Sequence, residues 1–180
     1  QQGLHVKVNT VVMKGVNDNE ILNFVAWTKN LPLHVRFIEF MPFDKNQWNT
    51  QKVFSYQEII DAAATKYSFL RMKDGENETA KKFKPFGHEG TFAVISTMSA
   101  PFCGNCNRMR LTADGKMKNC LFSKSETDLL TAFRAGKDIV PLIAQSIWDK
   151  KAALGGQFEA DIDHVDASHI ENRSMITIGG

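Results

Sequence analysis

The three cysteines of this chain all fall within one short stretch, CGNCNRMRLTADGKMKNC, which runs from Cys103 to Cys120. Cys103 and Cys106 have the C-x2-C spacing that lets two thiolates reach one metal centre from a single tight turn. Thirteen residues separate Cys106 from Cys120, and the pair Asp114-Gly115 among them predicts a β-hairpin. Because a hairpin folds the chain back on itself, the sequence predicts that the third thiol approaches the first two.

A site with three thiols favours an iron-sulfur cluster over a zinc ion. A structural zinc normally takes four protein ligands, and the nearest histidines, His88 and His164, are far away in the sequence without ligand spacing. A cluster held by three cysteines leaves one iron with an open position that can bind a substrate. Zinc stays open as a weaker alternative, and so do three unrelated buried thiols that bind no metal.

Two arginines lie between the cysteines. Arg108 and Arg110 alternate on one strand face within reach of the C-x2-C turn, where they could hold an anionic ligand, although hairpin arginines are in general more often solvated. A strict two-residue turn would pair Cys120 with Met109, on the face opposite the arginines. The predicted hairpin therefore needs a bulge or an irregular strand end.

Composition narrows the class of protein. The chain has 180 residues, 43% of them hydrophobic, which is enough to bury a real core, and its formal charge of +2 is too even for a dedicated nucleic-acid binder. No apolar run is long enough to span a membrane, and the first residues do not form a secretory signal. Three cysteines without an export signal are typical of a reducing compartment, so we expect a cytoplasmic protein without membrane or nucleic-acid partners. The chain does not begin with Met, and we expect it to be part of a larger protein.

The first forty residues predict a βαβ unit. Residues 6–12 alternate between apolar and polar, residues 17–30 have a helical pattern with Asn17 and Glu20 at capping-box spacing, and residues 34–43 form a second β-rich run that ends at Pro42. Such a unit implies two parallel strands joined by a crossover helix. Two strands cannot close a barrel, so the unit is expected to dock on strands that precede it.

The pattern changes after Pro42. Ser55 and Glu58 predict a second capping box at the start of a helix, residues 73–90 form a polar separating stretch, and residues 91–99 predict a further strand. From residue 125 to about 154 the apolar spacing predicts one helix that breaks near Gly136 and restarts around Pro141.

Polar residues at Lys7, Asn9 and Arg36 can be interpreted in two ways. They could occupy the solvent face of an edge strand. Strands of a parallel α/β unit are usually covered on both faces, however, so polar residues that point inward indicate a polar interior cavity.

The cysteine segment with its flanks, PFCGNCNRMRLTADGKMKNCLF, closely resembles the C-terminal cluster segment of the GTP 3',8-cyclase family, radical S-adenosylmethionine enzymes that begin molybdenum cofactor biosynthesis. The segments VKVNTVVMKGVND, VRFIEFMPFDKNQWN and FAVISTMSAPFC and the closing GG are similar to that family in the same order. The resemblance implies an α/β fold: residues 1–43 as the terminal βαβ portion of an incomplete TIM-type (β/α) barrel, and residues 44–180 as an α+β domain that binds a 4Fe-4S cluster and GTP.

The resemblance also implies roles for individual residues. Cys103, Cys106 and Cys120 would hold a 4Fe-4S cluster with an open iron that binds the guanine of GTP. The other matched positions are Lys7, Arg108 and Arg110 for GTP, Asn9, Arg36 and Met41 for S-adenosylmethionine, and Gly179 and Gly180 for a catalytic double-glycine tail. The family's second 4Fe-4S cluster sits on an N-terminal C-x3-C-x2-C, which this sequence lacks, so the chain alone is expected to be inactive.

The implied activity is a lyase reaction that rearranges GTP to (8S)-3',8-cyclo-7,8-dihydroguanosine 5'-triphosphate through a radical derived from S-adenosylmethionine. The resemblance further implies a homodimer at full length, whose product passes to cyclic pyranopterin monophosphate synthase. Two alternatives from other classes are a zinc-stabilised interaction module and a cluster-bearing electron-transfer domain.

Overall fold

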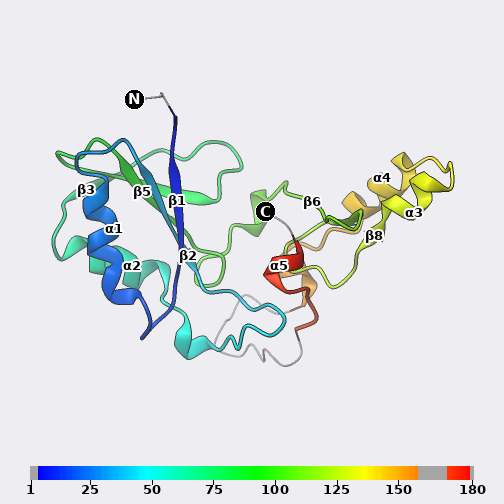
Figure 1. Ribbon diagram of the computed structural model, residues 1–180, viewed down its shortest axis with the longest axis horizontal. Coiled ribbons are helices and arrows are strands. Elements are labelled where there is room, and N and C mark those ends of the chain that lie inside the picture. The colour runs from blue at the N-terminus through cyan, green and yellow to red at the C-terminus, as the bar shows by residue number, and fades with distance from the viewer. Residues whose placement is uncertain (1–3, 158–169, 179–180) are drawn as a thin grey trace. The chain divides into compact units, whose positions relative to one another are not determined.

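The computed structural model describes residues 4–157 and 170–178 and divides the chain into two compact units (Figure 1). The first unit comprises Gln1–Met41 and Thr50–Phe102, and the second comprises Pro42–Asn49 and Cys103–Gly180. The division differs from the expected boundary between residues 43 and 44, because a later strand pairs with the second strand of the βαβ unit and brings residues 50–102 into the first sheet.

The first unit is built on a five-stranded mixed sheet with the order β1-β2-β5-β4-β3. Its strands are β1 (Lys7–Val12), β2 (His34–Glu39), β3 (Phe69–Arg71), β4 (Ala80–Pro85) and β5 (Thr91–Ile95). β1 and β5 both run parallel to β2, whereas β4 runs antiparallel to β5 and to β3. The predicted βαβ unit and the α/β fold class are therefore confirmed, with an antiparallel extension that the sequence analysis did not predict.

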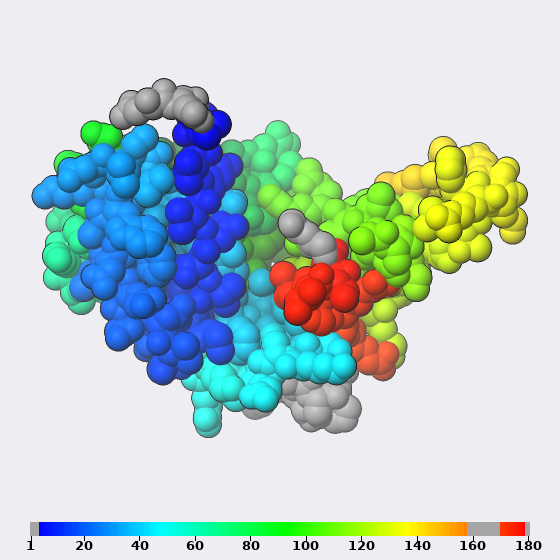
Figure 2. All heavy atoms as spheres, in the orientation of Figure 1, coloured from blue at the N-terminus to red at the C-terminus, as the bar shows by residue number. Residues whose placement is uncertain are grey.

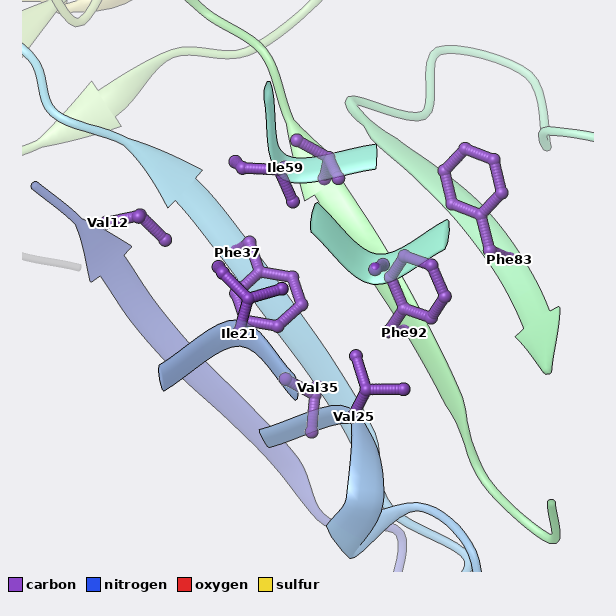
Figure 3. Packing of buried hydrophobic residues seen from close by; sticks show 10 residues of the cluster. Val12, Ile21, Val25, Val35, Phe37, Ile59, Phe83 and Phe92 are labelled. Carbon is purple, nitrogen blue, oxygen red and sulfur yellow. The ribbon is translucent and has the colours of Figure 1, made fainter. Parts of the chain in front are cut away.

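Two helices cover the apolar face of this sheet. Helix α1 (Ile21–Trp27) follows the short 3-10 turn η1 (Asp18–Glu20), and α2 (Tyr56–Ala64) follows η2 (Thr50–Lys52). The core is a cluster of ten buried residues from α1, α2 and four strands, which are drawn as sticks in Figure 3: Val12, Ile21, Val25, Val35, Phe37, Ile59, Ala63, Phe83, Phe92 and Val94. The helices thus close one face of the sheet and leave the other face to the polar side chains of the same strands.

The two predicted capping boxes have different outcomes. At α2 the Ser55 hydroxyl accepts from the Glu58 backbone N–H at 3.3 Å, and the Glu58 carboxylate accepts from the Ser55 N–H at 2.8 Å, as predicted. The box expected at Asn17 is wrong. Asn17 uses its side chain instead to bind the end of β1, because its Oδ1 accepts from Met13 N and its Nδ2 donates to the Val11 carbonyl.

The stretch at residues 73–90, expected to be a polar separator, contains β4. Its lysines conceal the pattern, but Phe83 is buried in the core cluster, and Ala80 is buried on the opposite, polar face of the sheet. The prediction missed this strand because an antiparallel strand near a sheet edge can carry polar residues on one face while burying the other.

The second unit has short strands and small helices. It consists of η3 (Cys103–Asn105), the strands β6 (Arg110–Leu111), β7 (Lys116–Lys118) and β8 (Thr127–Asp128), the helices α3 (Leu129–Arg134) and α4 (Val140–Trp148), η4 (Leu154–Gly156) and α5 (Met175–Ile178). The predicted helix break is confirmed, since Gly136 has φ +71° between α3 and α4 and Pro141 lies in the first turn of α4. In the described part of the chain, none of the helices combines the length and apolar character needed to cross a membrane.

Candidate functional site

The polar face of the first sheet gathers basic side chains from neighbouring strands. The register pairs Lys7 with His34 and Asn9 with Arg36 across β1 and β2, and Lys82 of β4 lies in the same row as Arg36, through Ala93 of β5. Residues paired in register project to the same side of a sheet. A cavity of about 290 Å³ opens on this face, lined by Lys7, His34, Arg36, Met72, Glu78, Ala80, Lys82 and Thr91.

Hydrogen bonds and charges order this cavity. The Arg36 Nε donates to the Asn9 Oδ1 at 2.7 Å, and the His34 Nδ1 lies 2.7 Å from the Thr91 hydroxyl. Burial lowers the pKa of His34, and the nearby charges of Arg36, Lys82 and Lys7 lower it further. Three basic side chains, Lys7, Arg36 and Lys82, line the cavity with one carboxylate, Glu78, which pairs with Lys82 at 2.5 Å, so its net charge is positive and suits an anionic ligand.

Lys7, Asn9 and Arg36 thus share one face, which both interpretations predict, and Lys7 and Asn9 are exposed at the edge strand β1. Sequence reasoning missed His34 and Lys82. His34 could have been found because it alternates with Arg36 on β2, whereas Lys82 lies in the stretch that was not predicted to be a strand.

Glu39, at the carboxyl end of β2, is a second residue that sequence reasoning missed. Its carboxylate is fully buried and accepts from the backbone N–H groups of Tyr56 at 2.7 Å, Met98 at 2.7 Å and Ser99 at 2.9 Å. A buried carboxylate requires such donors, so Glu39 fixes the segment after β5 and the start of α2. Met41, a predicted ligand contact, lies half-buried two residues beyond Glu39.

The C-x2-C pair forms a tight turn, as predicted. Cys103 and Cys106 bracket η3, and the Cys106 N–H donates to the Cys103 carbonyl at 3.1 Å. Cys120 follows β7 in a turn of its own, where the Ser123 N–H donates to its carbonyl at 3.1 Å. All three thiols are free and half-buried. Within residues 4–157 and 170–178, no three His, Cys, Asp or Glu side chains are grouped to hold a metal ion.

The predicted hairpin between the cysteines is confirmed, and it contains the extra residue that the sequence analysis required. β6 and β7 pair antiparallel with Leu111 opposite Met117, and Gly115 takes φ +74° in a three-residue loop closed by a hydrogen bond from Thr112 N to Lys116 O. Continued by the same count, this register sets Cys120 opposite Arg108 and not Met109, although the ladder itself ends earlier.

The two predicted arginines differ in their surroundings. Arg110 is half-buried at the start of β6, whereas Arg108 is exposed and precedes the strand, which is shorter than expected. The Lys150 ammonium donates to the backbone carbonyl of Arg108 at 2.9 Å and also to that of Asn119. Lys150, which the sequence analysis did not single out, therefore connects the segment that follows Cys106 with the segment that precedes Cys120.

A loop after α4 contacts the first cysteine. The Leu154 backbone N–H donates to the Cys103 Sγ at 3.4 Å, and Leu154 is buried at φ +45°. Gly155 follows at φ +67°, where a Cβ would lie 2.5 Å from the Phe122 carbonyl carbon. This close approach requires glycine, and it holds the donor loop against the segment that follows Cys120.

The donor chemistry of this region fits an iron-sulfur cluster. Three thiols without a neighbouring carboxylate in the set are soft ligands, and a backbone N–H directed at Cys103 Sγ is the kind of contact that stabilises thiolate sulfur in such clusters. The lack of a three-ligand group among the described residues concerns ligands around a single metal ion, whereas a cluster binds each thiolate through a different iron. Gly179 and Gly180, the predicted tail, lie outside the described residues.

A polar sheet face and a cysteine hairpin together define an α/β protein with a thiol-bearing second unit. The sequence model of the family described as Molybdenum Cofactor Synthesis C matches residues 33–155. The chain belongs to this family, which confirms the resemblance inferred from the cysteine segment.

Individual relatives support this assignment over nearly the whole chain. The protein named "GTP 3',8-cyclase, mitochondrial" from Arabidopsis thaliana is 45% identical over 97% of this chain and 44% of its own length. Proteins named "Molybdenum cofactor biosynthesis protein 1" are 45% identical in Bos taurus, over 96% of this chain, and 44% identical in Mus musculus, over 97%. Each match covers 27% of the animal protein, so the chain spans less than half the length of these relatives.

Proposed function

We propose that this chain is the C-terminal, substrate-binding portion of a GTP 3',8-cyclase that acts in molybdenum cofactor biosynthesis. The observation that carries the proposal is the cysteine hairpin, which lies within the matched family region and combines three free thiols with an N–H donor to Cys103 Sγ. Cys103, Cys106 and Cys120 would hold a 4Fe-4S cluster. When bound, this cluster would supply an open iron position for the guanine of GTP.

Within the second unit, Arg108 and Arg110 would orient the substrate. Both precede the hairpin loop by a few residues, on the side of the hairpin that begins at Cys106. A guanidinium presents several N–H donors in a fixed plane, so each arginine can make charge-assisted hydrogen bonds to a phosphate or to a base edge. Lys150 supports this side of the hairpin through its bond to the Arg108 carbonyl.

Within the first unit, the polar sheet face would bind the anionic parts of the two small molecules. Lys7 would contact a phosphate of GTP, while Asn9 would contact the ribose of S-adenosylmethionine and Arg36 its carboxylate or a phosphate. The Asn9–Arg36 hydrogen bond holds both side chains in place before a ligand arrives, which reduces the entropy lost on binding. Met41 would contribute backbone contacts to the adenine of S-adenosylmethionine.

The finer parts of the proposal concern the whole protein. They are an incomplete (β/α) barrel that includes the first sheet, an α+β iron-sulfur domain, a second 4Fe-4S cluster on an N-terminal C-x3-C-x2-C that generates the radical, and inactivity of the present chain by itself. They also include a homodimer, delivery of the product to cyclic pyranopterin monophosphate synthase, a role for Gly179 and Gly180 in catalysis, and a cytoplasmic location.

The test uses a full-length enzyme that carries this sequence, reconstituted anaerobically with iron and sulfide. We expect serine at Cys103, Cys106 or Cys120 to remove most of the iron of this cluster, while Arg108→Ala and Arg110→Ala keep it. The arginine variants should weaken GTP binding by about 1.5–3 kcal/mol, the loss expected for a hydrogen bond to a charged group. Lysine at either position should restore binding only in part, because it lacks the planar fork.

Three outcomes would contradict the proposal. Wild-type iron content in all three cysteine variants would remove the cluster assignment. Zinc in place of iron after metal analysis would favour the zinc-stabilised module. A cluster that forms but leaves GTP unbound in a titration would favour an electron-transfer domain.

A further inference from the structure

The cavity on the polar face of the first sheet has basic side chains on two sides. Lys7 and Arg36 lie on β1 and β2, whereas Lys82 lies on β4, beyond β5. Figure 2 shows the dark blue spheres of β1 and the blue-green spheres of the segment through β4 on the same side of this unit. In the register only the methyl side chain of Ala93 separates Arg36 from Lys82. Because strands are about 4.8 Å apart, the two backbones are about 10 Å from each other, and the long basic side chains can face one ligand across β5.

Glu78 holds Lys82 at this cavity. The Lys82 Nζ lies 2.5 Å from Glu78 Oε1, and the two side chains are only 33% and 25% exposed. The other carboxylate oxygen, Oε2, accepts from the Gly75 backbone N–H at 2.9 Å. The Lys82 ammonium lowers the pKa of Glu78, so the carboxylate is charged at neutral pH. Glu78 thus keeps a second partner, Gly75, when Lys82 turns to another anion.

The charges of the cavity distinguish between the two kinds of anionic group that the proposed ligands carry. Lys7, Arg36 and Lys82 supply three positive charges, and Glu78 supplies one negative charge. Burial lowers the pKa of His34, so this residue adds a polar group and no charge at pH 7. Two net positive charges suit a phosphate or polyphosphate, which carries several negative charges, better than a single carboxylate.

We infer that Lys82 is a further binding residue for the phosphate groups of GTP, opposite Lys7 and Arg36, and that the phosphate replaces Glu78 as its partner. The inference rests on the proposed function and extends the site to β4. A merely structural ion pair would make loss of either partner loosen the segment before β4, without improving GTP binding. A binding role gives opposite signs: losing Lys82 weakens GTP binding, whereas losing the charge of Glu78 strengthens it, because a competitor and a repulsive charge are removed.

The experiment compares Lys82→Met, Glu78→Gln and Lys84→Met in the full-length enzyme. Lys84 is the matched control, because it lies on the same strand and face but donates to the carbonyls of Glu89 and Gly90, at 2.8 and 3.2 Å, outside the cavity lining. Titration calorimetry would measure the Kd of GTP, of inorganic triphosphate and of S-adenosylmethionine. Hydrogen exchange of β4 would report the local stability of the same samples.

Lys82→Met should raise the Kd of GTP and of triphosphate by about tenfold or more, the scale of a lost hydrogen bond between charged groups. Glu78→Gln should lower both values by about threefold, the scale of one unit charge acting over several ångströms through water. Lys84→Met should stay within about twofold of wild type, a difference of less than ~0.5 kcal/mol. The Kd of S-adenosylmethionine should stay within the same limit of about twofold in all three variants.

Wild-type GTP affinity in Lys82→Met would overturn the inference, and so would unchanged or weaker GTP binding in Glu78→Gln. An equal loss in Lys84→Met, or an equal loss of S-adenosylmethionine binding in Lys82→Met, would also overturn it. If Lys82→Met does not fold, the sign of the change in Glu78→Gln decides alone.

The triphosphate titration separates this inference from the proposed function. If the chain does not serve a GTP enzyme, the wild type should bind triphosphate without binding GTP, and the opposite effects of Lys82→Met and Glu78→Gln should persist with triphosphate. A wild type that binds neither anion would overturn both the inference and the proposed function.

Discussion

The interiors of the two units differ in the length of their strands and in the size of their apolar cluster. The first unit buries a continuous apolar cluster, in which the rings of Phe83 and Phe92 stack with centroids 5.1 Å apart. The second unit has strands of two or three residues and buries several polar groups, among them Lys118, Asn119 and Ser146. Apolar burial is non-directional, whereas polar contacts depend on geometry. We therefore expect the first unit to tolerate small shifts and the second to depend on individual bonds.

The largest effect should come from the core of the first unit. Phe92 is fully buried, and its ring also packs edge-on against Phe37 and Phe69. We expect Phe92→Ala to lower the free energy of unfolding of this unit by about 3–5 kcal/mol, through lost transfer energy and the cavity left behind. Denaturant titration followed by hydrogen exchange of β2 and β5 would measure it.

The control for this change is Phe86→Ala. Phe86 is 61% exposed, so its loss should change the stability by less than about 0.5 kcal/mol. Equal effects of the two substitutions would show that apolar burial does not determine the stability of the first unit.

A smaller effect is expected at a buried polar contact of the second unit. The Lys118 side chain is 1% exposed, donates to the Ser123 carbonyl and to Asn172, and lies 3.7 Å from Glu126. Lys118→Met keeps the length of the side chain but removes its hydrogen bond to the buried Ser123 carbonyl and one of the two donors to Asn172 Oδ1, which should cost about 1–3 kcal/mol. The exposed Lys124→Met is the control, measured in the same way by exchange in β7 and β8. A stabilised Lys118→Met variant would mean that the second unit also relies mainly on apolar packing.

The smallest effect should be a difference in acid sensitivity. Burial lowers the pKa of both His34 and His88 in the first unit below the ordinary value of about 6.5. The folded state then binds fewer protons than the unfolded state, so this contribution is complete above about pH 6.5 and is lost as the pH falls toward the lower folded pKa. Asp114 and Glu126 in the second unit have lowered pKa values, so their contribution is lost only below about pH 4, near the ordinary values.

Lowering the pH from 7 to 5.5 should therefore decrease the amide protection factors of the first unit more than those of the second. His34→Gln should reduce this fall, because glutamine does not titrate. An unchanged pH response in that variant would show that His34 makes no contribution to it.

The same comparison explains which features the sequence could predict. Alternation in residues 6–12 and 34–39 and the Ser55–Glu58 pair predict β1, β2 and the start of α2, because apolar period and capping are local properties. β4 was missed because its three lysines make the segment look polar in the sequence, while the burial of Phe83 depends on a partner strand. The Asn17 box was wrong because a contact with Val11, six residues away, competes with the cap.

The features of the candidate site also fall into two groups: local ones that the sequence predicts and long-range contacts that it does not. The Asp114-Gly115 pair predicts the hairpin, and the thiol spacing indicates a cluster, because both are encoded within eighteen consecutive residues. Arg173, Lys150 and Leu154 could not be found, since each acts on the hairpin from 30 to 60 residues away through contacts that only the folded chain forms. A strand that alternates His34 with Arg36 did contain a signal for a wider basic face, which the analysis did not use.

The second unit is discontinuous in the sequence, and this has a consequence for how the protein is made. Phe43 stacks on Phe122 with ring centroids 5.9 Å apart, but 78 residues separate the two along the chain. At a synthesis rate of about 5–20 residues per second, the ribosome needs roughly 4–16 s to make that interval. Residues 42–49 emerge long before the unit to which they belong, while most of the first unit is still to be made. No single cut in the gene separates the two units.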